Sequence, residues 1–262
     1  MKNFQFKKSL GQNFIRDENI INKIVDKALI DKDTLVIEIG PGAGSLSKKI
    51  IPLSGYTILY EIDTRLKDIL NNELAGNNNY KIIFNDFLCQ DLKKDIAEYN
   101  YKKIYVVANL PYYITSPIIT KLAEEIYPDR IVIMVQEEVA DRLVAREGNK
   151  DYGMISCFLG VKYKIVKLFR VNRGSFYPVP NVDSAVILLD KRNDYIDINM
   201  DLYAKLLRDA FQFKRKTLKN NLRNYDLLVL DNVLKKYNLS LVNRAEEVPI
   251  EVFVEMVRVL DK

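Results

Sequence analysis

The tetrapeptide Asn-Leu-Pro-Tyr at residues 109–112 combines groups that could prepare the exocyclic amine of a nucleobase for attack. The lone pair of such an amine is delocalised into the ring, so it must first be localised on nitrogen. The Asn109 amide oxygen could accept one N–H, and a neighbouring main-chain carbonyl could accept the other. Pro111 keeps Leu110 out of the helical region, so these carbonyls remain available. Tyr112 supplies a ring on which an unstacked purine could stack, which is worth roughly 1–3 kcal/mol. These four residues are the candidate catalytic residues.

The tetrapeptide alone also fits a plain strand end, in which residues 105–108 form the strand and the tyrosines pack in a core. A second motif favours the chemical interpretation. It is Glu-Ile-Gly-Pro-Gly-Ala-Gly at residues 38–44, directly after an apolar run.

The glycine spacing of this second motif separates several classes of ligand. A dinucleotide fingerprint that begins at Gly40 and Gly42 would place its third glycine at position 45, which is Ser45. No Gly-Lys-Ser or Gly-Lys-Thr follows, so a Walker P-loop is excluded. S-adenosylmethionine carries no phosphate, and glycines here would let its methionine part approach the backbone without Cβ atoms in the way.

Acidic residues follow the next two predicted strands. Glu61 ends the second strand, where a carboxylate can accept the ribose hydroxyls of a nucleoside, whether from NAD or from S-adenosylmethionine. Asp86 ends the third strand and could accept from an adenine amine, with Phe87 covering the ring. With Glu38 and Asn109, polar groups stand at four successive strand ends and should meet in one crevice. Taken singly, each acid could instead cap a helix or sit in a solvated turn.

The alternation of apolar runs predicts an α/β fold with a doubly wound, mostly parallel sheet. A helix at 17–29 begins with Asp17 as its cap. Strands are then expected at 35–39, 56–60, 80–84, 103–108 and 130–135, and helices at 45–50, 64–74, 89–98, 116–126 and 136–145.

The pattern changes after the turn-rich residues 148–153. Residues 161–171 and 184–190 indicate paired strands, and the segment between them contains Pro178 and Pro180, which exclude a central strand. From about residue 199 only helices are expected, at 200–222, 226–237 and 249–260. We therefore predict a catalytic domain at 1–196, with a basic N-terminal arm, and a smaller all-helical domain at 197–262.

Composition limits the classes of protein that the chain could be. With 262 residues and 48% hydrophobic residues it can bury a substantial core. It has no histidine, and Cys89 and Cys157 are 68 positions apart, so we expect no metal site and buried thiols in a reducing compartment. No apolar run is long enough to span a bilayer, so we expect a cytoplasmic protein without a membrane partner.

The net charge of +5 is unevenly distributed. Residues 1–16 carry four basic and no acidic side chains, and residues 204–223 carry seven basic side chains and only Asp209. Such concentrations suit contact with phosphates, although a solvated helix face has the same composition. The candidate RNA-binding residues are Lys7, Lys8, Lys214, Arg215, Lys216, Lys219 and Arg223.

Four motifs in this order carry a family resemblance. They are Leu10-Gly11-Gln12-Asn13-Phe14, Asn109-Leu110-Pro111-Tyr112, Val182-Asp183-Ser184-Ala185 and Lys214-Arg215-Lys216-Thr217-Leu218. From about residue 7 to about 253 the chain resembles the small-subunit rRNA adenine dimethyltransferases of the bacterial 16S type. Residues 176–180 depart from the family, in which three consecutive prolines are often found.

The resemblance implies a class I, Rossmann-like methyltransferase with S-adenosylmethionine as the methyl donor and no metal. It implies that Asn13 and Ile15 close over the donor; many relatives have leucine at position 15. It further implies dimethylation of the N6 amines of two adjacent adenosines in the loop of the 3′-terminal hairpin of small-subunit rRNA. The expected partner is the immature small subunit, and we expect a monomer.

Other functions remain open on the residues alone. A large-subunit rRNA methylase that confers antibiotic resistance would share the glycine turn and a similar tetrapeptide. A non-catalytic ribosome-assembly or RNA-binding factor could keep the same fold. A DNA adenine methylase is disfavoured, because these commonly carry aspartate and a second proline where this chain has Asn109 and Leu110.

Overall fold

The computed structural model describes residues 13–195 and 197–261. They form two compact units, one from the chain as far as Ala140 with Val166–Lys191, the other from Asp141–Ile165 with Arg192 onward. Residues 141–165 thus group with the C-terminal helices, although they lie inside the catalytic domain predicted at 1–196. The functional division at residue 196 stays a prediction.

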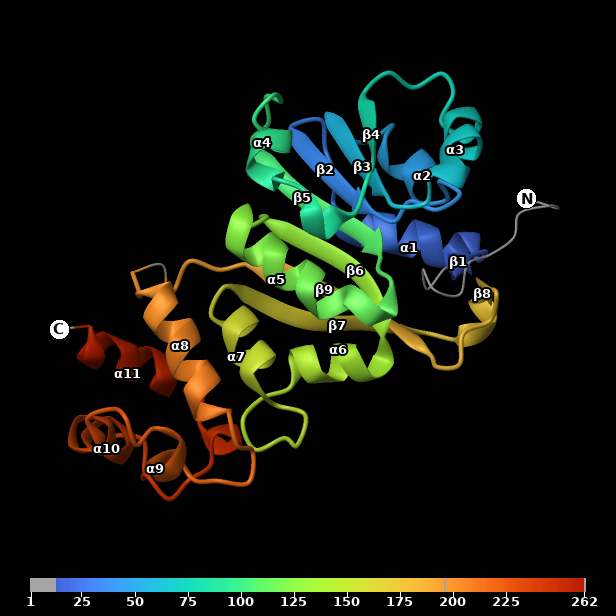
Figure 1. Cartoon of the computed structure of the whole chain (residues 1–262). Helices are drawn as coiled ribbons and strands as arrows, with labels where there is room; N and C mark the ends of the chain where they lie inside the picture. Colours follow the sequence, from blue (N-terminus) through green and yellow to red (C-terminus); the bar gives the residue numbers. More distant parts are fainter. Residues whose placement is uncertain (1–12, 196, 262) are drawn as a thin grey trace. The chain divides into compact units, whose positions relative to one another are not determined.

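A seven-stranded sheet, which belongs to the first unit except for the first three residues of β7, has the strand order β4-β3-β2-β5-β6-β9-β7 (Figure 1). The strands are β2 (Thr34–Ile39), β3 (Tyr56–Glu61), β4 (Tyr80–Phe84), β5 (Lys103–Asn109), β6 (Arg130–Gln136), β7 (Tyr163–Val171) and β9 (Ser184–Lys191). The strands from β2 to β6 pair in parallel, and β9 runs antiparallel to β6. The prediction of a mostly parallel α/β sheet is confirmed.

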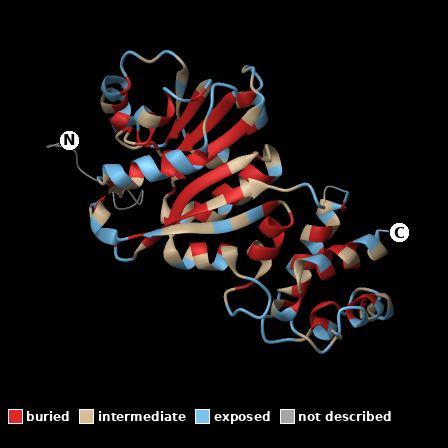
Figure 2. Cartoon of the chain, turned by 180° about the vertical axis from the view of Figure 1, so that it is seen from behind, coloured by how far each residue is buried: buried red, intermediate tan, exposed pale blue. Residues whose placement is uncertain are grey.

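Helices cover both faces of this sheet. On one face lie α1 (Glu18–Ala28), α2 (Ser47–Ile50) and α3 (Lys67–Glu73), and Figure 2 shows α1 in front of the strands. On the other face lie α4 (Leu92–Ile96) and α5 (Thr115–Glu125), with α5 in front in Figure 1. The apolar stripe of α1 packs on Val107 and Val132. As predicted, the Asp17 carboxylate caps α1 by accepting from the Asn19 N–H.

A second, two-stranded sheet was not predicted. In it β1 (Phe14–Ile15) pairs antiparallel with β8 (Phe176–Tyr177). The pairing fixes residues near the start of the chain beside the segment that precedes β9. That segment contains Pro178 and Pro180 and lies outside the seven-stranded sheet, as their presence requires.

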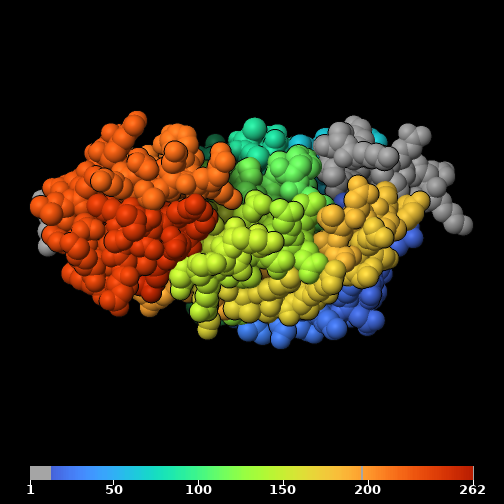
Figure 3. Space-filling model, turned by 90° about the horizontal axis from the view of Figure 1, so that it is seen from below, coloured from blue at the N-terminus to red at the C-terminus, as the bar shows by residue number. Residues whose placement is uncertain are grey.

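The second unit is helical in its C-terminal part, which Figure 3 shows in orange and red. Its helices include α7 (Met154–Gly160), α8 (Met200–Ala210), α9 (Leu218–Asn221), α10 (Leu227–Lys235) and α11 (Ile250–Leu260). Helix α7 was not predicted. It precedes β7, which begins at Tyr163 and not at the expected residue 161.

The single helix predicted over 200–222 is wrong. Helix α8 ends at Ala210, and residues 211–217 form a turn before α9 begins. The cause is the side chain of Asn221, which is 8% exposed and donates to the carbonyl oxygens of Ala210 at 2.6 Å and Phe213 at 3.3 Å. The Ala210 and Phe213 carbonyls therefore have a hydrogen-bond donor although the helix does not continue.

The two cysteines differ in environment. Cys157 is buried, as expected, whereas Cys89 is exposed, so the prediction of two buried thiols is wrong for Cys89. Cys89 ends the short 3-10 helix η3 (Phe87–Cys89) that follows β4 at the surface, and its position in a connection explains its exposure.

Candidate functional site

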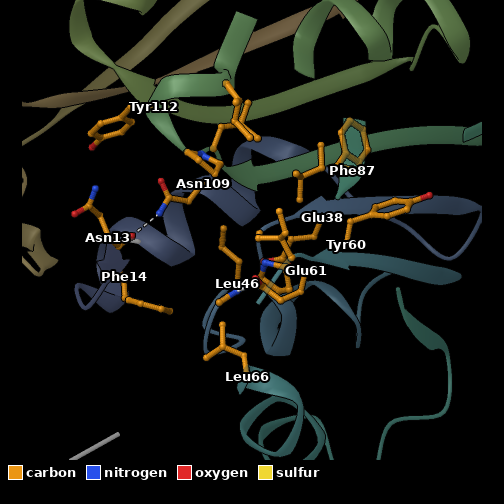
Figure 4. Close-up of a pocket in the computed structure, with 18 of the residues that line it drawn as sticks. Asn13, Phe14, Glu38, Leu46, Tyr60, Glu61, Leu66, Phe87, Asn109 and Tyr112 are labelled. Carbon is orange, nitrogen blue, oxygen red and sulfur yellow. Dashed lines mark hydrogen bonds between the residues drawn. The ribbon is translucent and has the colours of Figure 1, made fainter. Parts of the chain in front are cut away.

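One pocket collects all the residues predicted to bind a methyl donor or to act in catalysis. It lies at the carboxyl ends of β2, β3, β4 and β5 and encloses about 980 Å³, its open mouth included. The predicted residues among its lining are Asn13, Ile15, Glu38, Gly40, Gly42, Glu61, Asp86, Phe87, Asn109, Leu110, Pro111 and Tyr112. Figure 4 shows Asn109 between Tyr112 on one side and Glu38, Tyr60 and Phe87 on the other.

Asn109 ends β5, and only the NH₂ group of its side-chain amide is hydrogen-bonded within the described residues. Its Nδ2 donates to the Asn13 carbonyl oxygen at 2.9 Å (Figure 4). In the part of the chain that the structure describes, neither its Oδ1 nor the Leu110 carbonyl oxygen accepts a hydrogen bond. The Leu110 N–H, in contrast, is occupied by the Met134 carbonyl at 3.1 Å. Two acceptors therefore remain for an incoming amine.

Tyr112 begins the short 3-10 helix η4 (Tyr112–Ile114) after Pro111. Its hydroxyl lies 2.6 Å from the hydroxyl oxygen of Ser184, and either atom could donate. Ser184 is fully buried at the start of β9, so a rigid strand fixes the phenol end of the ring. Burial raises the pKa of Tyr112, which keeps the hydroxyl neutral.

The glycine turn after β2 requires glycine for its backbone geometry. Gly40, Gly42 and Gly44 have φ of +69°, +58° and +81°, which other residues adopt only with strain. A Cβ on Gly42 would also stand 2.6 Å from the Phe14 ring. The Phe14 ring thus lies directly against the turn.

Glu61 connects the turn to the end of β3. Its Oε2 accepts from the Gly42 N–H at 3.1 Å and its Oε1 from the Asp63 N–H at 2.9 Å. The residue is 4% exposed, and burial raises the pKa of its carboxyl although these two N–H groups oppose the shift. Each oxygen has further accepting capacity toward the pocket, which suits paired hydroxyls.

Glu38 is the more deeply buried acid. It is 1% exposed, and its Oε2 has no hydrogen-bond partner among the described residues. Burial raises the pKa of its carboxyl to about 8, and repulsion from Glu61 adds to the shift. An unsatisfied buried carboxyl oxygen is costly, so a polar ligand group that reached it would be stabilised.

Asp86 both lines the pocket and caps a helix. Its Oδ1 accepts from the Leu88 N–H at 2.9 Å at the start of η3, so the capping role considered from the sequence is present. Phe87 is 4% exposed and packs edge-on against Tyr60, with ring centroids 5.1 Å apart. The two adjacent residues offer an acceptor and an aromatic wall.

Several lining residues were missed by the sequence analysis. Phe14 lies inside a motif quoted there, and Tyr60 directly precedes Glu61, so position in or beside a motif was the available signal. Leu46 and Leu66 complete the apolar wall of the pocket. Nothing in their local sequence distinguishes them from ordinary core leucines.

The predicted RNA-binding residues fall into two groups along the sequence. Lys7 and Lys8 fall outside the described residues. Lys214, Arg215 and Lys216 stand in the turn between α8 and α9, Lys219 lies in α9 and Arg223 follows it. All five of these later residues are exposed.

No cluster of three or more histidine, cysteine, aspartate or glutamate side chains suited to a metal ion is found within residues 13–195 and 197–261. Over the same ranges, every helix is too short or too polar to cross a bilayer.

Comparison with known proteins assigns the chain to a family. It is 42% identical over 252 residues to the ribosomal RNA small subunit methyltransferase A of Aster yellows witches'-broom phytoplasma, an alignment that covers 94% of this chain and 93% of the relative. A dimethyladenosine transferase structure from Plasmodium falciparum matches with a TM-score of 0.81 at 26% identity, covering 95% of this chain and 97% of that one. The 23S rRNA methyltransferase ErmE matches with a TM-score of 0.75 at 25% identity, covering 95% and 100%. Residues 3–262 match the family described as ribosomal RNA adenine dimethylase, and the chain belongs to this family.

Proposed function

We propose that this protein dimethylates the N6 amines of two adjacent adenosines in the loop of the 3′-terminal hairpin of small-subunit rRNA, with S-adenosylmethionine as the donor. Membership of the rRNA adenine dimethylase family and the 42% identity to a small-subunit methyltransferase support this activity. The observation that carries it is the held Asn109 amide, which leaves an acceptor oxygen at a pocket wall beside the Leu110 carbonyl.

The residues of the pocket fit S-adenosylmethionine. Glycines at 40 and 42 place backbone without side chains along the pocket, Glu61 can accept ribose hydroxyls, and Phe87 with Asp86 can receive the adenine. The buried, unsatisfied Glu38 oxygen could accept from the amino group of the methionine part. When bound, S-adenosylmethionine supplies a methyl group on a positively charged sulfur.

The chain's own contribution to the reaction is to prepare the amine. Asn109 Oδ1 accepts one N–H of adenine N6 and the Leu110 carbonyl accepts the other, so the lone pair is localised on nitrogen. Tyr112 stacks on the base and limits its rotation. The amine becomes strongly acidic as its nitrogen gains a bond, and its proton leaves to solvent after the barrier. No general base is needed, which agrees with a chain that has no histidine.

The remaining predictions complete this proposal. The basic residues after α8 contact rRNA phosphates, and residues 197–262 bind the ribosome. The enzyme acts as a monomer on the immature small subunit in the cytoplasm. RNA loops present unpaired bases, so extruding the target adenosines costs less than it would in a duplex.

The test is to incubate the protein with labelled S-adenosylmethionine and one of three substrates. These are small subunits from a strain that lacks the modification, deproteinised small-subunit rRNA, and large subunits. We expect label in dimethyladenosine at two adjacent positions of small-subunit rRNA. Label on large subunits would instead support the activity named for ErmE, and absence of label with all three would support a non-catalytic assembly factor.

A further inference from the structure

The turn at residues 211–217, called here the basic turn, displays an aromatic ring among cations. Phe213 is 57% exposed, although a phenylalanine is usually buried. Lys214, Arg215 and Lys216 follow it directly, and Lys219 lies one turn further in α9. A single exposed apolar residue needs no explanation, but an exposed aromatic ring followed directly by three cations has the composition of a surface for single-stranded nucleic acid.

The basic turn is fixed by contacts of its own. The Phe213 carbonyl accepts from the Lys216 N–H at 2.9 Å and from the Asn221 side chain at 3.3 Å. Asn221 also anchors the end of α8 at Ala210, from a position that is 8% exposed. The backbone that carries the Phe213 ring therefore has a defined conformation before a partner arrives, which lowers the entropy cost of binding.

The cations of the basic turn have no ionic partner among the residues that the structure describes. Lys214, Arg215 and Lys216 form no ion pair and donate no side-chain hydrogen bond to the described part of the chain, and the same holds for Lys219 and Arg223. Two acids that precede α11, Glu246 and Glu247, interact with Arg244 and not with these cations. The Glu246 carboxylate lies 3.8 Å from the Arg244 guanidinium, and the Glu247 carboxylate accepts a hydrogen bond from the Arg244 main-chain N–H.

We propose that Phe213 stacks on an unpaired base of small-subunit rRNA outside the methylation pocket, while the cations of the basic turn hold the phosphates on either side of that base. The inference rests on the proposed function, because the partner is the same RNA. An aromatic face accepts any base, so this contact adds affinity and register without reading sequence. The charge of the basic turn favours RNA over a protein partner, whose contact surfaces are depleted of lysine.

Leu228 provides a contrast within the same unit. It is 72% exposed at the start of α10, and it lies between Asp226 and Asp231 in the sequence. An apolar side chain with acidic neighbours has no electrostatic reason to approach phosphates. Leu228→Ala is therefore the matched control for the loss of an exposed apolar side chain.

The experiment measures affinity for unmethylated small subunits, in the absence of methyl donor, over a range of salt concentrations. Phe213→Ala should weaken binding by about five- to hundredfold, because stacking on one base is lost. The slope of log affinity against log salt should stay unchanged, since no charge is removed. Lys214→Ala should flatten the slope by roughly 0.7 to 0.9. Phe213→Trp should retain wild-type affinity, Phe213→Leu should not, and Leu228→Ala should have no effect.

A photo-cross-link locates the contact directly. A single-stranded oligouridylate with 5-iodouridine should cross-link to the peptide that contains Phe213 in the wild type, and to the same peptide of the Phe213→Trp variant. Equal affinity of Phe213→Ala and wild type for small subunits overturns the proposal. Full affinity of Phe213→Leu overturns it as well, because any apolar side chain would then suffice and a protein partner would be indicated. These binding results stand apart from methylation, so wild-type protein that binds but does not methylate refutes the proposed function alone.

Discussion

The Asn109 side chain donates a 2.9 Å hydrogen bond to the main-chain carbonyl of Asn13, 96 residues earlier in the chain. A carbonyl oxygen can only accept, so it selects one of the two orientations of the Asn109 amide. The NH₂ group faces Asn13, and Oδ1 is left for the pocket. Asn13, which precedes β1, thus takes part in setting the direction of the proposed acceptor.

Replacement of Asn109 by alanine should lower turnover by about 10²–10³, the scale measured for comparable preorganised polar groups. Its acceptor oxygen matters most when the amine gains positive charge, so subunit binding should barely change. Asn109→Asp keeps an acceptor, so we expect a smaller loss of turnover than for Asn109→Ala. Some loss remains because the new carboxylate faces the Asn13 carbonyl and cannot donate to it. Single-turnover methyl transfer at saturating donor measures both variants, with subunit binding as control. A wild-type rate for Asn109→Ala would mean that the amine is activated elsewhere.

Replacement of Glu61 by alanine should reduce the affinity for S-adenosylmethionine at least tenfold. Hydrogen bonds to a charged group are typically worth about 1.5–3 kcal/mol each before water compensates. The Gly42 and Asp63 N–H groups also lose their acceptor, so thermal melting must show that the variant is folded. Titration calorimetry gives the affinity. Unchanged binding by a folded variant would remove Glu61 from the donor site.

Replacement of Gly42 by alanine should impair both folding and donor binding. A left-handed φ costs a residue with a Cβ about 1–2 kcal/mol, and the new methyl group would press on Phe14. Gly76 is the matched control, because its φ is +89° and a Cβ there would have no neighbour within 4 Å. Urea unfolding should show a lower free energy of unfolding for both variants, because both place a Cβ at a left-handed φ. If only Gly42→Ala loses donor affinity, the added Cβ at the pocket wall is the reason, through its contact with Phe14 or with the donor; equal affinities would contradict this.

How far the sequence predicts this site depends on the range of each interaction. The polar ends of four strands could be predicted, because parallel strands place their carboxyl ends on one edge. The bonds that orient Asn109 and Tyr112 could not, since their partners are 96 and 72 residues away. No local pattern encodes such pairs.

The missed secondary structure has similar causes. Residues 211–217 contain no glycine or proline, so propensity favours a continuous helix, and the tertiary contact of Asn221 overrides it. Helix α7 is a short apolar run, which periodicity cannot distinguish from a buried strand. The α/β part was predicted well because its buried strands are short, continuous apolar runs separated by polar and turn-forming residues.

Removal of the bond between Tyr112 and Ser184 from either end should have similar effects. Tyr112→Phe and Ser184→Ala each delete one hydroxyl of the 2.6 Å pair, and each should lower turnover a few- to tenfold because the ring is less well fixed. The double variant should lose little more than either single one, with a coupling energy of about 1 kcal/mol. Methylation rates and urea unfolding are compared for all four proteins. Additive losses in rate would show that the two hydroxyls act independently.

The stability of the protein should depend on the ionisation of Glu38. Burial raises its pKa from 4.5 to about 8. The folded protein therefore holds this proton over a range in which the unfolded chain has lost it, and stability falls as pH rises through that range, by up to about 1.4 kcal/mol per pH unit. Glu38→Gln removes this dependence and should show a flatter profile. Urea unfolding between about pH 5 and pH 8 measures it, and identical slopes for both proteins would contradict the assignment.

The strand order gives the site a fixed scale. Asp86 follows β4, Glu61 and Asn109 end β3 and β5, and Glu38 is the last residue but one of β2; these four strands are consecutive neighbours in the sheet. Adjacent strands lie about 4.8 Å apart, so the span from Asp86 to Asn109 is set at roughly 14 Å by backbone hydrogen bonds. Side-chain replacements can change which groups meet a ligand, but they cannot shorten this span. The spacing of the strands therefore fixes how long a ligand must be to contact both Asp86 and Asn109, whichever side chains line the site.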